Sequence, residues 1–135
     1  MNRIVITLLT LLIFFVFSNA QQKGKEVMVV GEVIELQCYI SGLTGPGKGL
    51  THKECALKSA KQGIPLGIVE EKTGMIYLVG QTKKAQSSAN DLLIPFIAEK
   101  VKVSGRIFEK SGMKLLLVKE INKLNVDEKK KEDKK

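Results

Sequence analysis

Two nine-residue segments far apart in the chain share one pattern, and this pattern requires strands that bend. Residues 27–35 read Val-Met-Val-Val-Gly-Glu-Val-Ile-Glu, and residues 101–109 read Val-Lys-Val-Ser-Gly-Arg-Ile-Phe-Glu. Each segment is rich in β-formers around a central glycine, Gly31 or Gly105, where a strand can bulge or coil. We therefore predict two strands that bend at equivalent points.

The first strand is expected to span residues 26–38 and to change its apolar face at Gly31, because its apolar residues change phase there. The residues expected on the two faces are Val27 and Val29, then Ile34, Leu36 and Cys38.

Alternation and turn signals predict the four strands that follow the first. Residues 64–70 and 75–79 flank Glu-Lys-Thr-Gly and predict a hairpin. Apolar and polar residues alternate through residues 101–107, which is typical of a half-buried strand. Ser111 and Gly112 then turn the chain into a last strand. Its expected apolar face consists of Met113, Leu115, Leu117 and Ile121.

Two capping patterns predict helices. Thr51 and Glu54 form Thr-x-x-Glu, a capping box, so a helix should begin at His52. It should end near Gln62, because Gly63 can adopt the left-handed conformation that terminates helices.

Ser88-x-x-Asp91 caps a second, short helix, which Pro95 should kink or divide. The apolar residues of this second helix are Leu92, Leu93, Phe96 and Ile97.

The order of these elements predicts a mainly β fold. Three strands, a short helix and two strands follow one another, with the first helix inserted between strands one and two. This is the arrangement of a five-stranded OB-fold-like Greek-key barrel. The first and fourth strands of such a barrel are bent neighbours, which accounts for the shared pattern around Gly31 and Gly105.

The ends of the chain predict segments outside the barrel domain of residues 26–124. Arg3 precedes an apolar run at residues 4–17 and a Ser-Asn-Ala site, which indicates a signal peptide over residues 1–20 and export to the periplasm or medium. The alternative is a membrane anchor, but the run is shorter than the about 20 residues that span a bilayer. Residues 21–25 form a short linker, and residues 125–135 form a charged, disordered tail.

The charge balance is basic. The whole chain carries +8, and loss of Arg3 with the signal peptide leaves +7. Such a balance favours acidic partners in general and does not name one.

The helical insertion carries the distinctive side chains. It holds both cysteines, Cys38 and Cys55, and the single histidine, His52. On a helix, His52, Cys55 and Ser59 share one face. Cys38 can meet that face if the glycine-rich loop between them folds back.

Several of these segments together carry a resemblance. Gly-Glu-Val-Ile-Glu-Leu-Gln-Cys-Tyr, His-Lys-Glu-Cys-Ala and Gly-Ile-Pro-Leu-Gly-Ile, followed by Met-Ile-Tyr-Leu and Val-Lys-Val-Ser-Gly-Arg, resemble small exported bacterial proteins with an OB-fold-like domain. The resemblance covers about residues 26–122, and its most specific part is Cys…His-x-x-Cys-Ala. Relatives often place another cysteine four residues after the second, whereas this chain has Ser59. This difference weakens the case for a site of three thiols.

Cys38 and Cys55 allow three interpretations. In an exported protein they can form a disulfide that closes a loop of eighteen residues, which stabilises by about 3 kcal/mol in the chain-entropy model. With His52 they can instead bind Cu(I), which favours thiolates, or zinc with an open position. They can also be buried thiols without a further role. We place the disulfide first on the sequence alone, because Ser59 replaces a thiol.

The glycine loop invites a comparison with nucleotide-binding loops. Residues 42–48 match the start of a P-loop, but Gly49 occupies the place of the magnesium-binding Ser or Thr. Nucleotide hydrolysis is therefore not the expected activity. The weaker expectation is a small-anion site formed by amides near the helix start with Lys48 and Lys53.

Nucleic acid is not the expected ligand, although OB-folds bind single strands. The mature chain offers few aromatic rings, with Tyr39 and Tyr77 as the stacking candidates. Nor do we recognise a catalytic arrangement of serine, histidine and acid or a pair of carboxylates, so we do not expect an enzyme.

These observations predict an exported OB-fold-like binding module with a Cys/His site in the insertion, for a small ligand or a protein partner. The first alternative is a periplasmic protein for copper, zinc or thiol redox chemistry, with no metal bound if the disulfide forms. The second is a module for single-stranded nucleic acid or anionic ligands.

Overall fold

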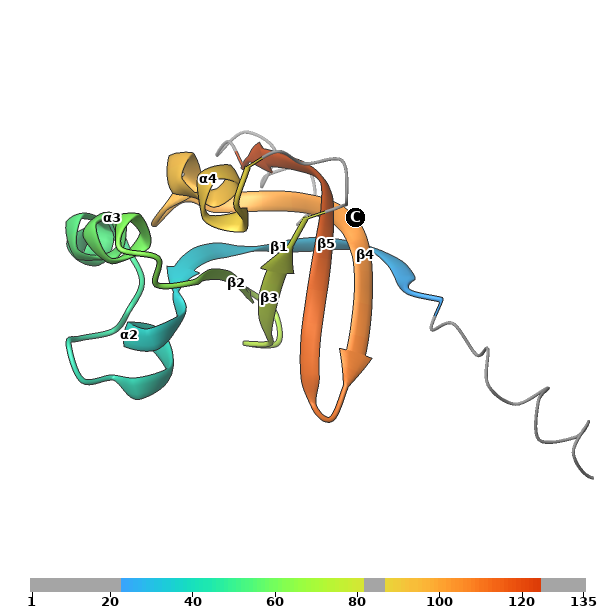
Figure 1. Ribbon diagram of the computed structural model, residues 1–135, viewed down its shortest axis with the longest axis horizontal. Coiled ribbons are helices and arrows are strands. Elements are labelled where there is room, and N and C mark those ends of the chain that lie inside the picture. The colour runs from blue at the N-terminus through green and yellow to red at the C-terminus, as the bar shows by residue number, and fades with distance from the viewer. Residues whose placement is uncertain (1–22, 82–86, 125–135) are drawn as a thin grey trace, which may run out of the picture.

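Five strands close into a barrel in the computed structural model, which describes residues 23–81 and 87–124 (Figure 1). The strands are β1 (Lys25–Glu35), β2 (Leu66–Glu70), β3 (Ile76–Gly80), β4 (Lys100–Lys110) and β5 (Met113–Lys123). Their order around the barrel is β1-β2-β3-β5-β4, and β1 closes the barrel against β4. The pairing of β3 with β5 is parallel and the others are antiparallel. The OB-fold-like barrel predicted from the sequence is confirmed.

Some predictions fall outside the described residues. These are the signal peptide at residues 1–20, the start of the linker and the tail at residues 125–135. In the described part of the chain, no helix is long and apolar enough to cross a membrane.

The glycines of the shared pattern lie at close backbone contacts. A Cβ atom at Gly31 would lie 2.2 Å from the carbonyl oxygen of Val69, and one at Gly105 would lie 2.3 Å from that of Leu117. Gly31 pairs with both β2 and β4, and the β4–β5 register shifts between Ser104 and Gly105. The two glycines therefore let β1 and β4 bend where a side chain would clash.

The structure corrects the predicted course of β1. The strand ends at Glu35, and Leu36 and Cys38 belong to a short helix, α2 (Leu36–Ser41). Val29 and Val33 continue along one face into the barrel core, while Ile34 packs with Leu36 in a second cluster. Both faces of β1 are buried at this end because α2 and β2 cover the outer one.

The predicted apolar face of β5 is also wrong at its start. Leu116 is fully buried, whereas Met113 is 61% exposed. The bulge explains the difference: Glu120 pairs with Ser104 but Val118 pairs with Gly105, so Lys119 is passed over. Residues before the bulge therefore reverse their faces relative to Ile121, which still packs on the core.

The remaining helices lie at the same end of the barrel as α2: in the view of Figure 1, α3 (Lys53–Lys61) lies above α2, and α4 (Ala89–Leu93) lies higher and nearer the strands. A 3-10 turn, η2 (Leu50–His52), leads into α3, and another, η3 (Ile94–Phe96), follows α4. Ser88 and Asp91 form the predicted capping box. The predicted box at Thr51 is not formed as expected, since Thr51 lies within η2 and His52 is the N-cap of α3.

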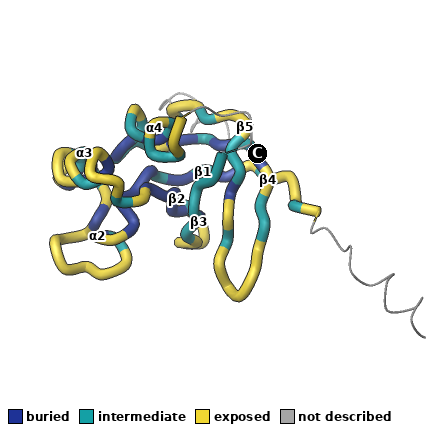
Figure 2. The backbone as a smooth tube through the Cα atoms, viewed as in Figure 1, coloured by how far each residue is buried: buried dark blue, intermediate teal, exposed yellow. Residues whose placement is uncertain are grey.

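The core fills the barrel and extends under the helices (Figure 2). Its buried members are Val29, Val33, Ala56, Ala60, Leu66, Ile68, Tyr77, Leu93, Ile97, Val101, Val103 and Leu116. Two alanines of α3 belong to this core, so α3 is fixed to the barrel and the side chains on its other faces have defined positions.

Candidate metal centre

The first ligand position is built by the turn from β1 into α2. The Glu35 carboxylate accepts hydrogen bonds from the amides of Gln37 (2.7 Å) and Cys38 (3.0 Å) and so caps α2. A carboxylate at a helix start satisfies amides that have no partner within the helix. This cap ends the strand and places Cys38 in the first turn, where it is buried.

The glycine-rich loop then folds back onto α2, which is the condition for Cys38 to meet His52 and Cys55. Gly42 ends α2 in the left-handed conformation, and Gly47, at φ 64°, sits against the backbone of Tyr39. A Cβ atom at Gly47 would lie 2.3 Å from the Tyr39 nitrogen. At the end of the loop the Gly49 amide donates to the Glu32 carboxylate of β1.

This return brings three potential ligands together. The ligand atoms of Cys38, His52 and Cys55 all lie within 4.8 Å of one another. In the described part of the chain they are the one such group of three or more His, Cys, Asp or Glu side chains. The juxtaposition expected for these residues is therefore present, on α2, η2 and α3.

His52 is the most unusual member of the group. Only 5% of its surface is exposed, and its Nε2 atom is buried without a hydrogen-bond partner among the residues that the structure describes. A buried polar atom without a partner costs about 1–3 kcal/mol, so such atoms usually have a ligand, a water or an ion beside them.

The two cysteines are free thiols with different surroundings. The hydrogen bond with Glu35 raises the pKa of the Cys38 thiol, and burial acts in the same direction. Thr44 opposes this by donating its hydroxyl to the Cys38 sulfur at 2.8 Å. Cys55 is exposed on α3, so the group opens to solvent on that side. Ser59 lies one turn further along α3 and is half-buried.

The groups predicted to bind a small anion contact other parts of the protein. Lys53 forms an ion pair with Glu99 at 3.2 Å, and the Lys48 ammonium lies 5.9 Å from the centre of the Tyr39 ring. The Gly49 amide already binds the carboxylate of Glu32. These contacts argue against a small anion as the ligand of this loop.

The stacking candidates are also engaged. Tyr77 is buried in the barrel core, which removes its ring from any base and raises the pKa of its hydroxyl. Tyr39 is half-buried against the second cluster. Tyr77 is thus corrected from a binding residue to a core residue.

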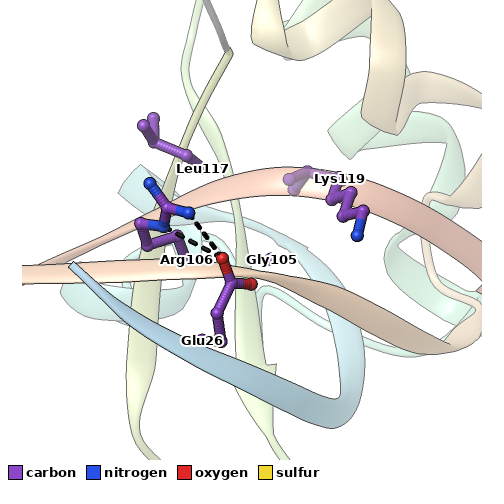
Figure 3. A pocket seen from close by; sticks show the side chains of 6 residues that line it. Glu26, Gly105, Arg106, Leu117 and Lys119 are labelled. Atoms are coloured by element: carbon purple, nitrogen blue, oxygen red, sulfur yellow. Dashed lines mark hydrogen bonds and ion pairs between the residues drawn. The ribbon is translucent and has the colours of Figure 1, made fainter.

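A separate hollow of about 310 Å³ lies on β1, β4 and β5 at the bulge (Figure 3). Arg106 points to Glu26 across it, and its Nε and Nη2 atoms donate to one carboxylate oxygen at 3.0 and 2.7 Å. Arg106 and Glu26 thus satisfy each other, and among its described residues this hollow holds no group of metal-ligating side chains like the Cys/His group.

Two residues beside the group were not identified from the sequence. The sequence pattern predicts Glu35 in a strand and gives Thr44 no role in its loop. A carboxylate immediately before Leu-Gln-Cys-Tyr could have suggested a helix N-cap. Nothing local to Thr44 indicates its contact with Cys38, which depends on how the loop returns.

Comparisons of the chain with protein-family models, with curated proteins and with solved structures found no match. The chemistry of the Cys/His group is therefore the main indication of function.

Proposed function

We propose that this protein is a binding module that holds one soft metal ion, Cu(I) or zinc, between Cys38, His52 and Cys55. The observation that carries the proposal is that the ligand atoms of two thiols and one imidazole lie within 4.8 Å of one another, and that this imidazole is buried with its Nε2 atom unpartnered among the described residues. Thiolate and imidazole together are the donor set that Cu(I) and zinc prefer.

The size of the group suits an ion. Bonds of about 2.3 Å to sulfur and 2.0 Å to nitrogen place the ligand atoms roughly 3.5–4 Å apart around a metal. A spread of up to 4.8 Å therefore needs only small side-chain movements to close. Thr44 would stabilise the bound thiolate of Cys38 by its hydroxyl, and α2 and α3 would each hold one cysteine ligand.

A disulfide between Cys38 and Cys55 is the second candidate. The same short separation of the two sulfur atoms supports it. A disulfide, however, uses neither nitrogen of the buried His52, whereas a metal ion gives its imidazole a partner. That difference favours the metal over the disulfide.

The test is metal titration of the reduced chain from residue 21 onward, purified without oxygen. We expect one Cu(I) or zinc ion per chain against a chromophoric competitor, with release of protons as the thiols ionise. His52→Ala should weaken binding by at least about tenfold, since even the partners of ligands contribute this much. The matched control is Ser59→Ala on the same helix, which should bind normally.

The opposite outcome is equally specific. Protein from its native compartment would then take up no metal, contain no titratable thiol and yield a peptide linked through Cys38 and Cys55. These results would show a disulfide in place of the metal centre. Unchanged binding in His52→Ala would remove the histidine from the ligand set.

We also propose that the protein is exported, which the sequence pattern of residues 1–20 supports. The intact mass of protein from the cell envelope or medium should then begin at Gln21. A mass that retains residues 1–20 would contradict cleavage.

A further inference from the structure

The most exposed apolar side chains gather in the insertion that carries the Cys/His group. Among the described residues, the three large hydrophobic residues with the greatest exposure are Leu43 (86%), Leu50 (73%) and Ile40 (67%). Single exposed apolar residues are common on protein surfaces, so the inference rests on the position of these three in the segment that carries the ligands. We refer to Ile40, Leu43 and Leu50 as the apolar rim.

Each residue of the apolar rim lies close along the chain to a ligand or to Thr44. Ile40 follows Cys38 by two residues on α2, and Leu43 adjoins Thr44, whose hydroxyl contacts the Cys38 sulfur. Leu50 begins the 3-10 turn that contains His52. In Figure 2 this loop after α2 forms an exposed projection at one end of the barrel.

The centre itself is open toward solvent. Cys55 is exposed while Cys38 and His52 are buried, so the ion would be reached from the side of Cys55. Three protein ligands also leave one position of a four-coordinate ion free. A ligand atom from another protein can enter there without prior unfolding of the site.

The charge around the rim selects the partner. Residues 36–65 contain four lysines and one glutamate, a net charge of +3. Lys48, Lys58 and Lys61 are exposed, whereas Lys53 is paired with Glu99. Complementary potentials direct the encounter of two proteins and exclude partners of like charge. The surface therefore fits an acidic protein.

We propose that the apolar rim docks a partner protein that offers a cysteine ligand within an apolar patch edged by acidic side chains, and that the metal ion passes between the two. This inference rests on the proposed metal centre. The partner's thiolate enters the open position, and Cys55, the exposed ligand, leaves first. Each partner thiol that binds loses a proton, each cysteine that leaves takes one up, and the oxidation state of the ion is unchanged.

The experiment compares two double variants of the Cu(I)-loaded mature chain. The rim variant is Leu43→Ser with Leu50→Ser, and the matched control is Met28→Ser with Met113→Ser, whose side chains are 62% and 61% exposed on β1 and β5. Proteins of the native compartment are captured on each immobilised chain and identified. The captured protein is then purified and used as the probe for binding and for Cu(I) transfer.

We expect the captured protein to be acidic, to contain cysteine, and to bind the rim variant at least about tenfold more weakly than the control, since buried apolar side chains dominate such interfaces. The rate of Cu(I) transfer to it should fall equally. Transfer to a small chelator should be the same for both variants, because the rim contacts the partner and not the ion.

Several results would overturn the inference. They are capture that does not depend on the rim, a captured protein without cysteine, or no captured protein at all. Rim-dependent dimers in sedimentation would assign the surface to a second copy of the chain, and rim-dependent binding to anionic vesicles would assign it to a lipid surface. If the wild-type chain binds no Cu(I), the metal centre fails; if it binds Cu(I) and the rim has no effect, the docking surface alone fails.

Discussion

Cys38 and Cys55 lie in one group, yet their surroundings differ. Cys38 is buried in the first turn of α2, and its pKa is raised chiefly by the hydrogen bond with Glu35. Cys55 faces solvent from α3. The reactive form of a cysteine is the thiolate, so burial and the raised pKa both slow reaction at Cys38, whereas Cys55 is accessible to reagents.

The expected result is selective alkylation. Iodoacetamide at neutral pH should modify Cys55 at least about tenfold faster than Cys38 in the reduced, metal-free protein. Peptide mapping by mass spectrometry measures both rates, and the same protein in concentrated urea should show nearly equal rates. Faster reaction at Cys38 would contradict the burial and hydrogen bonding described for it.

Among the elements, the position of α3 depends on Asn90 of α4. Its amide nitrogen donates to the carbonyl oxygens of Ala60 (3.1 Å) and Ile64 (2.8 Å), and its oxygen accepts from the Leu66 amide (3.0 Å). One side chain thus joins the end of α3, the start of β2 and α4. Together with Ala56 and Ala60 in the core, this contact holds the helix that carries Cys55.

Asn90→Ala should therefore lower the free energy of unfolding by about 2–3 kcal/mol, because three hydrogen bonds of about 1 kcal/mol each are lost. Urea unfolding followed by circular dichroism measures the loss. The matched control is Asn122→Ala on β5, whose exposed side chain bonds only with Glu120 in the described structure and should change stability by less than about 0.5 kcal/mol. Equal effects at both sites would refute the proposed link.

At the scale of the whole molecule, Glu99 connects the insertion with the barrel. Its carboxylate pairs with Lys53 at the start of α3 (3.2 Å) and with Lys123 at the end of β5 (3.0 Å). Lys123 first and Lys53 next hold the pKa of Glu99 below its ordinary value of 4.5, against the opposing effect of burial. The charged form is therefore favoured in the folded protein.

The lowered pKa of Glu99 in the folded protein fixes the sign of its effect on stability as the pH changes. The contribution of Glu99 is complete above the unfolded pKa and is lost as the pH falls through the lower folded pKa. Glu99→Gln should cost less than about 1 kcal/mol at pH 7, since solvent screens these pairs, and should reduce the fall in stability below about pH 4.5. Denaturant midpoints between pH 7 and 3 measure this, with Glu120→Gln as control. An unchanged slope below pH 4.5 would contradict the assignment.

The sequence by itself determined the features that depend on near neighbours. The hairpin of β2 and β3, the Ser88 cap and the bends at Gly31 and Gly105 follow from turn chemistry, capping and the absence of a Cβ atom. Their order along the chain then restricted the closed barrel to the arrangement found. The spacing of His52 and Cys55 likewise placed both near the start of one helix.

Tertiary structure alone decided what depends on distant partners. The cap at Glu35 places Cys38 in α2 and not in the predicted strand. The bulge at Gly105 reverses the buried face of β5 relative to the predicted one. Strand pairing buried Tyr77, and the fold-back of the loop at Gly47 set Cys38 beside His52 and Cys55. The physical reason is that burial and ligand separation depend on which remote backbone lies opposite a residue, and local sequence does not encode that.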